Sequence, residues 1–193
     1  MNKEEIINMI GEKYSPLTSA CKLEFSNHSK ILKLKKGDAI VKEGQYSDKA
    51  FFIVRGCARA YYLNDGKDIT DWFAFEKDFI CAINSFFQNI PSPHYIEALE
   101  ETLLLEVSRD NTLKLSDKYH DFERLSKTVA TKTMLKLQAR IVSIQFQSAE
   151  QKYQSILSAY PNITQRIPLT HIASFLGITL ETLSRIRKLN SRI

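Results

Sequence analysis

Two charged residues near the carboxyl end of the sequence, Glu181 and Arg185, carry side chains that can read base edges in DNA. An arginine can donate a bidentate pair of hydrogen bonds to O6 and N7 of guanine, and a glutamate can accept from N4 of cytosine. Side chains at this spacing lie one helical turn apart, which suits neighbouring base pairs. The simpler alternative is an intrahelical ion pair worth about 0.3–0.5 kcal/mol, and the two interpretations are compatible.

The surrounding residues have the spacing of two short helices that cross at a turn. Gly177 falls at the turn, where a positive φ is needed and a Cβ would be costly. The pattern predicts a helix-turn-helix whose second helix, 180–188, enters the major groove of DNA. The alternative is a helical hairpin packed on a larger domain. The positions where the two helices must touch are apolar or small: Ile172, Ala173, Leu176, Ile178, Leu183 and Ile186.

The exposed face of the second helix follows from its inward positions. Thr179 is the predicted N-cap, with its hydroxyl accepting from an amide of the first turn. Thr170 and Lys188 suit phosphate contacts and solvated positions equally well. If Leu183 and Ile186 point inward, the opposite face presents Leu180, Glu181, Ser184, Arg185 and Lys188.

The distribution of charge favours nucleic acid as the partner. Residues 151–193 hold six cations, Arg192 among them, and one anion, and this net charge of +5 equals that of the whole protein. Residues 1–150 balance 21 cations with 21 anions. A basic end on a neutral body is the electrostatic footprint expected of a protein that contacts phosphates.

Composition sets broad limits on the class of protein. The 193 residues suffice for one large domain or two small ones. No apolar run approaches the ~18 residues of a membrane span, and the opening residues lack a signal-peptide core, so we expect a cytoplasmic protein with no membrane partner. Cys21, Cys57 and Cys81 are scattered, and the histidines lack metal-ligand spacing. Buried thiols, with no metal and no cofactor, are therefore expected.

The hydrophobic period changes twice along the body of the chain. Residues 2–27 have helical spacing, and short β-branched and aromatic segments follow between 31 and 108, which predicts a closed or double-sheet β structure. Residues 109–146 lack proline and glycine, which predicts one long helix with cations such as Lys136 and Arg140 on its solvated face. Its apolar stripe is interpreted as a subunit contact rather than intramolecular core alone, through Phe122, Leu125, Val129, Leu137 and Ile141.

The order of these parts resembles the Crp/Fnr family of bacterial transcription regulators, named after the cyclic-AMP receptor protein and the fumarate–nitrate regulator. The resemblance covers nearly the whole chain and implies an α+β fold. Its parts would be an N-terminal cyclic-nucleotide-binding-like β jelly roll at 1–112, a long dimerisation helix at 113–147 and a C-terminal helix-turn-helix domain at 148–193. The motifs that carry it are 36–44 (KGDAIVKEG), 51–56 (FFIVRG), 65–67 (DGK), 98–100 (ALE) and 182–185 (TLSR).

The resemblance also implies base contacts by Glu181 and Arg185, a homodimer on double-stranded DNA, and contact with RNA polymerase. Leu180 stands where the family often has arginine or another polar residue, and it could touch a thymine methyl. Only five residues, 189–193, follow the recognition helix. A wing hairpin would therefore come from residues before Leu169, with Arg166 as its phosphate contact, or be missing.

Departures from the family concern the effector, whose identity the sequence leaves unknown. Members that bind cyclic AMP hold its phosphate with a Gly-Glu pair and an Arg-Ser or Arg-Thr pair. This chain lacks that glycine–glutamate pair and has no arginine from Glu76 to Val107, so tight cyclic-nucleotide binding is not expected. The aromatic residues of the β segment are either core or an apolar effector pocket. The predicted pocket residues are Tyr61, Trp72, Phe73, Phe79 and Phe86.

The sequence therefore predicts a homodimeric, sequence-specific DNA-binding regulator of transcription. An enzyme is not expected, because the β segment has no clustered carboxylates, nucleophile–base pair or phosphate loop. The alternative from another class is a β-roll ligand-binding or scaffold module whose C-terminal helices mediate protein contacts.

Overall fold

The computed structural model describes residues 1–190, and its internal contacts divide the chain into two units. Unit 1 comprises residues 1–60 and 73–133. Unit 2 comprises residues 61–72 and the chain from Met134 onward. The division differs from the predicted boundaries because the tip of a β-hairpin, 61–72, groups with the C-terminal helices. Contacts between segments so distant in sequence leave no local pattern, so the boundary predictions followed chain order alone.

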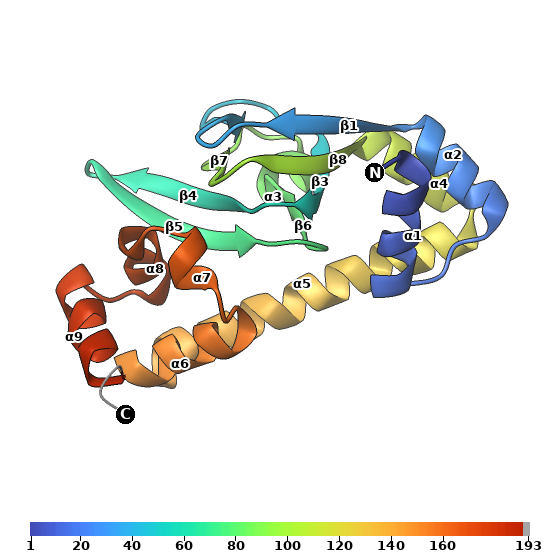
Figure 1. Ribbon diagram of the computed structural model, residues 1–193. Coiled ribbons are helices and arrows are strands. Elements are labelled where there is room, and N and C mark those ends of the chain that lie inside the picture. The colour runs from blue at the N-terminus through green and yellow to red at the C-terminus, as the bar shows by residue number, and fades with distance from the viewer. Residues whose placement is uncertain (191–193) are drawn as a thin grey trace. The chain divides into compact units, whose positions relative to one another are not determined.

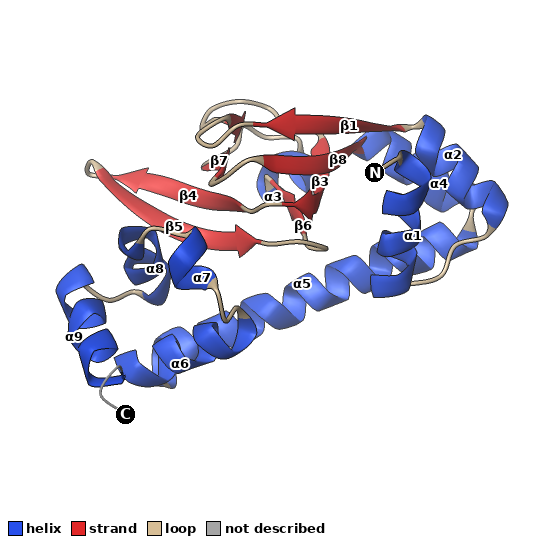
Figure 2. Cartoon of the chain, viewed as in Figure 1, coloured by secondary structure: helices blue, strands red, loops and turns tan. Residues whose placement is uncertain are grey.

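A β-roll of two four-stranded sheets forms the body of the chain (Figures 1 and 2). In the first sheet both neighbours of β8 pair with it antiparallel, Ile31 and Phe52 each lying opposite Leu105. The predicted α+β class with a β-roll is confirmed. The first sheet has the order β1 (Ser29–Leu34), β8 (Thr102–Ser108), β3 (Lys49–Arg55), β6 (Phe79–Cys81), and the second the order β2 (Ala39–Val41), β7 (Tyr95–Ala98), β4 (Ala58–Asn64), β5 (Lys67–Ala74).

A glycine is required where the chain turns from β3 into β4. Gly56 has φ +92°, in the left-handed region that L side chains rarely adopt. A Cβ on Gly56 would lie 2.6 Å from Glu101 O and 2.6 Å from Thr102 Oγ1. Both the backbone angle and the close approach of a neighbouring segment therefore exclude other residues here.

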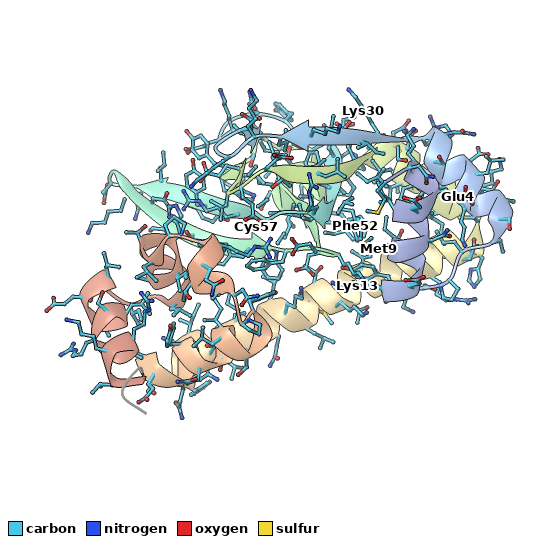
Figure 3. All side chains as sticks on the ribbon, in the orientation of Figure 1. Glu4, Met9, Lys13, Lys30, Phe52 and Cys57 are labelled. Carbon is cyan, nitrogen blue, oxygen red and sulfur yellow. The ribbon has the colours of Figure 1, made fainter. Side chains whose placement is uncertain are left out.

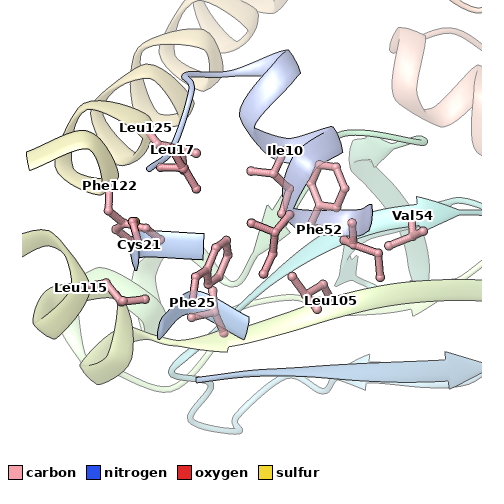
Figure 4. Close-up of a cluster of buried hydrophobic side chains, with 13 residues drawn as sticks. Ile10, Leu17, Cys21, Phe25, Phe52, Val54, Leu105, Leu115, Phe122 and Leu125 are labelled. Carbon is pink, nitrogen blue, oxygen red and sulfur yellow. The ribbon is translucent and has the colours of Figure 1, made fainter. Parts of the chain in front are cut away.

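Two N-terminal helices, α1 (Lys3–Lys13) and α2 (Ser19–Asn27), cover one face of the first sheet. Asn2 and Glu5 form a capping box at α1, and Thr18 caps α2. Alternate residues of β3 and β8 face these helices, including Phe52 and Leu105 (Figure 4). Lys13 on α1, which is labelled in Figure 3, forms an ion pair of 3.0 Å with Asp78, before β6. The buried cluster is Ile6, Ile7, Ile10, Leu17, Cys21, Phe25, Phe52, Val54, Leu105, Val107, Leu115, Phe122 and Leu125.

The predicted single long helix is wrong in one respect, because the chain forms two helices there. Residues Arg109–Lys118 form α4 and His120–Phe146 form α5, with Tyr119 extended between them at φ −127° and ψ 107°. The new helix begins where the Asp121 carboxylate accepts hydrogen bonds from the N–H groups of Thr18 and Phe122. Sequence spacing missed this break because no proline or glycine marks it. The short α3 (Ile83–Gln88) precedes β7.

The stripe on α5 divides between the core and the surface. Phe122 and Leu125 are 2% and 3% exposed and belong to the buried cluster, and Val129 packs against that cluster. The predicted subunit contact is wrong for Phe122 and Leu125, which are buried within their own chain, whereas for Val129, which is half-buried, it stays a prediction. The prediction overlooked the N-terminal helices as a partner for the first turns of the stripe.

Substituting Asp121 with alanine should lower the free energy of unfolding by about 1–3 kcal/mol at pH 7, because its carboxylate accepts the Thr18 N–H at 2.6 Å. Burial alone would raise the pKa of Asp121, but hydrogen bonds from Thr18 and its neighbours outweigh it and hold the pKa below its usual value. The contribution is therefore present above the ordinary carboxyl pKa of about 3.9 and lost as the pH falls through the lower folded value.

Urea unfolding at pH 7 and at pH 3 measures this effect. Asp121→Ala should differ from the wild type more at pH 7 than at pH 3. Asp117→Ala, an exposed aspartate on α4, serves as the matched control and should change stability little at either pH. An equal loss for both variants would show that charge, not the hydrogen bonds at Thr18, matters.

Two of the three cysteines are buried, as expected, and Cys81 is half-buried. Cys21 and Cys57 are fully buried, and all three are thiols. Burial raises the pKa of Cys21 to about 12, aided by the nearby Asp121 carboxylate, and burial also raises the pKa of Cys81 to about 12. Since the thiolate is the reactive form, Cys21 and Cys81 are poor nucleophiles near neutral pH.

Unit 2 is helical apart from the β-hairpin tip. It contains the second half of α5, then α6 (Ala149–Ala159), α7 (Ile163–Arg166), α8 (Leu169–Leu176) and α9 (Leu180–Asn190). Ser148 caps α6 in a capping box with Gln151. Within residues 1–190, no helix is both long enough and apolar enough to cross a bilayer.

Candidate nucleic-acid interface

The turn between α8 and α9 has the geometry that its sequence predicts. Gly177 adopts the left-handed conformation at φ 66° and ψ 34°. The N–H of Ile178 donates to Ala173 O at 3.0 Å, the 6→1 hydrogen bond of a Schellman turn. Thr179 Oγ1 then accepts from Thr182 N–H at 3.1 Å, so the predicted N-cap is confirmed. These local interactions fix where α8 ends and α9 begins.

A small apolar core holds α9 in place. Leu183 and Ile186 point inward, as predicted, against α6 and α8. Ala173 is 2% exposed at the crossing, where a larger side chain would force the two helices apart. The buried residues of this core are Tyr153, Ile156, Ile163, Ile167, Ile172, Ala173, Leu176, Leu183 and Ile186.

The opposite face of α9 carries the predicted base-reading residues. Glu181, Arg185 and Lys188 are exposed on this face, and Ser184 is half-buried. Leu180 is 43% exposed, which is unusual for a leucine and leaves its methyl groups able to meet an apolar partner. Thus the structure brings together on one surface the residues that the sequence assigned to base contacts.

Glu181 and Arg185 can be compared with the intrahelical ion pair that the sequence left open. Among the ion pairs of the described residues, none joins Glu181 to Arg185, so the intrahelical alternative is not formed. Both side chains are exposed, one turn apart on α9. A guanidinium and a carboxylate placed in this way offer donors and an acceptor to a planar hydrogen-bonding edge.

The predicted phosphate contacts flank α9 on neighbouring elements. Thr170 is exposed in the first turn of α8, and Arg166 is half-buried at the end of α7. The described residues after Phe146 form helices and turns only, so α7 stands where a wing hairpin before Leu169 would have been. Arg192, the last cation of the basic segment, lies outside the described residues.

The second half of α5 exposes an apolar stripe that the sequence only partly identified. Ile141 is 56% exposed and Leu137 half-buried, so these two predicted contacts lie at the surface. Met134 and Ile141 recur at a spacing of seven residues, as do Leu135 and Val142, which is the repeat of a coiled-coil seam. The exposed apolar residues are Met134, Leu135, Ile141, Val142, Ile144 and Phe146.

The five residues predicted to line an effector pocket lie in different parts of the chain, and the pocket stays a prediction. Phe79 packs against Phe52 and Tyr14, with ring centroids 5.1 and 5.5 Å apart, and so belongs to the core beneath α1. Phe73 contacts Phe75, and Phe86 contacts Phe87 on α3. Tyr61 and Trp72 lie half-buried in the hairpin of unit 2. A cleft of about 290 Å³ in unit 1 is lined by other residues, among them Leu32, Val41, Tyr46 and Phe51.

One buried arginine in the β-roll was missed by the sequence analysis. Arg59 on β4 is 3% exposed, and its Nε donates to Glu97 Oε1 on β7 at 2.7 Å. It precedes the segment 76–107 that was searched for a phosphate-binding arginine. The Glu97 carboxylate already compensates the charge of this guanidinium. An arginine alternating with alanines in a strand was the one available signal.

Comparison with known proteins supplies the family context. The profile described as Cyclic nucleotide-binding domain matches residues 31–119. No curated protein matches the chain in sequence. FixK2 from Bradyrhizobium japonicum has a similar structure, with TM-score 0.71 and 19% identity over 85% of each chain. The same holds for a CooA mutant from Carboxydothermus hydrogenoformans, with TM-score 0.69 and 16% identity over 100% of this chain and 85% of that one.

A third similar structure is described as a transcriptional regulator of the Crp/Fnr family from Eubacterium rectale. Its TM-score is 0.69 and its identity 21%, over 91% of this chain and 85% of that one. At these identities the likeness establishes the fold. The resemblance to the Crp/Fnr regulators is thus confirmed: the chain has their fold, and residues 31–119 match the profile of a cyclic nucleotide-binding domain.

Proposed function

We propose that this chain, with its cyclic nucleotide-binding domain and Crp/Fnr fold, is a homodimeric, sequence-specific DNA-binding regulator of transcription. The observation that carries the proposal is the exposed face of α9, where Leu180, Glu181, Arg185 and Lys188 gather on a helix fixed by its own core. A helix of this kind can enter the major groove and present side chains to base edges. Contact with RNA polymerase and an effector are further parts of the proposal.

The second copy of the chain would dock along the exposed stripe of α5. Two apolar seams from Met134 to Phe146 would bury each other, as in a two-stranded coiled coil. A two-fold axis along this seam would present two α9 helices to successive turns of a duplex, about 34 Å apart. The bound site would then be a pseudo-palindrome.

Binding to DNA should weaken steeply as salt rises, because cations that neutralise phosphates release condensed counterions. A dimer that neutralises about six phosphates would give a log–log slope of about −5 for the association constant. The slope is measured by fluorescence anisotropy with a labelled duplex. The salt concentration is varied from about 50 to about 200 mM, where the effect is large. Selection of bound sites from random DNA would then give the half-site and its symmetry.

The rival proposal is a β-roll scaffold whose C-terminal helices contact proteins. It predicts a flat salt response and no enriched sequence after selection. The excess of cations in residues 151–193, with Glu181 as their one anion, disfavours it because protein-binding faces tend to exclude charge from their centres.

A further inference from the structure

The helices α8 and α9 are here termed the reader, and the hairpin tip formed by residues 61–72 is termed the strap. The strap is bound to α8, the first helix of the reader. Ser174 lies on α8, and its Oγ accepts from Thr70 N–H at 2.8 Å while donating to Asp68 O at 3.0 Å. One hydroxyl therefore bridges two backbone positions of β5. Thr70 is fully buried, so this seam excludes water. Strap and α8 both belong to unit 2.

Arg140 on α5 contacts both the strap and α8 at the same place. Its Nη1 donates to Phe175 O at 2.8 Å and its Nη2 to Thr70 O at 3.4 Å. The guanidinium lies 4.0 Å from the centroid of the Phe175 ring, a cation–π contact. Sequence analysis had assigned Arg140 to the solvated face of α5, but its side chain is partly buried. Burial lowers the pKa of Arg140, although the nearby Asp71 carboxylate acts in the opposite direction and raises it.

The carbonyl that Arg140 binds belongs to the last turn of α8, where helix carbonyls lack partners within the helix. A cation at this end also meets the negative end of the helix dipole. Lys136, one turn before Arg140, lies 5.8 Å from the centroid of the Trp72 ring, where the strap ends. The side chains of Ser174, Arg140 and Lys136 thus join α5, α8 and the strap.

The covalent connection between α5 and the helices that follow it is short. It restrains the orientation of the reader less than the contacts with the strap do. Only Gln147 and Ser148 separate α5 from α6. Rotation about these two residues would turn the remaining helices as a body, since α6, α8 and α9 share one core. The seam with the strap resists that rotation, because turning α8 would break the hydrogen bonds of Ser174 and Arg140.

We propose that the strap sets the orientation of the α8–α9 reader, so that a dimer accepts one spacing of half-sites. This rests on the proposed function as a DNA-binding dimer. The strap does not mask the reader, because Glu181, Arg185 and Lys188 are exposed while the seam is closed.

The test compares two DNA probes obtained by selection with the wild-type protein: the full two-half-site duplex and one half-site alone. Ser174→Ala should weaken binding to the full duplex about tenfold, because losing a fixed orientation lowers the effective concentration of the second reader. Binding to the single half-site should stay unchanged. Ser155→Ala, an exposed serine on α6, is the matched control and should leave both unchanged.

Hydrogen exchange supplies a readout independent of affinity. In Ser174→Ala the Thr70 amide should exchange at least about tenfold faster, because its acceptor is gone. Adding the full duplex should slow that amide in the wild type, since coupling between two sites is reciprocal. If Ser174→Ala does not fold, Arg140→Lys keeps the charge while losing the guanidinium fork, and the same measurements apply.

Each other outcome overturns the inference. Equal loss on both probes would make Ser174 a support of the reader's own fold. Tighter binding by the variant would make the strap inhibitory, and unchanged binding would leave it without a role in orientation. If the wild type yields no selected sequence, the proposed function itself fails, which is a separate result.

Discussion

Arg185→Ala should weaken binding to the selected DNA site by about 1–3 kcal/mol, which is roughly 5- to 150-fold, and should relax the preference at one base pair. The reason is the position of Arg185, exposed on α9 opposite the inward Leu183 and Ile186 and without an ion pair to Glu181. Its guanidinium can therefore give both hydrogen bonds to one guanine. Repeating the selection with the variant measures the relaxed position.

Two further variants separate base reading from general attraction. Arg185→Lys keeps the charge but loses the planar fork, so it should retain the salt slope while losing the base preference. Lys152→Ala removes a cation from α6, away from the reading face, and should weaken all sequences slightly and equally. Uniform loss for Arg185→Ala on every sequence would mean that Arg185 contacts phosphate only.

Local signals predicted the reader well because the turn chemistry is local. Gly177 needs its positive φ, Thr179 caps the next amide turn, and Leu183 and Ile186 repeat at helical spacing. Each of these requirements acts within a few residues, so the sequence alone specifies it. The exposed face of α9 then follows from the buried face by geometry.

Long-range packing explains what the sequence could not supply. Phe122 and Ile141 are both apolar residues on one helix stripe, yet the first is buried by α2 and the second is exposed. Nothing in the periodicity of α5 distinguishes them, because the difference lies in which other segment covers each turn. Arg140 and Ser174 likewise became recognisable only when the strap, about 70 residues earlier for Arg140, was seen against them.

Ile141→Asp should convert the dimer to monomer at micromolar concentration and lower affinity for the full DNA site by roughly 10²- to 10⁴-fold through lost avidity. Ile141 is central in the exposed stripe, and two aspartates facing each other across a two-fold seam would be buried as like charges. The monomer should stay folded, because Ile141 is 56% exposed in the single chain and contributes little to its core. Analytical ultracentrifugation gives the oligomeric state, and urea unfolding checks the fold.

Ser155→Asp is the matched control, since Ser155 is exposed on α6, outside the apolar stripe of α5. It should therefore leave both the dimer and the affinity for DNA unchanged. A dimer that survives Ile141→Asp would move the subunit contact off α5 and would remove the geometric basis for two readers spaced one duplex turn apart. Monomer formation by both variants would instead indicate that added negative charge, rather than the apolar seam, controls association.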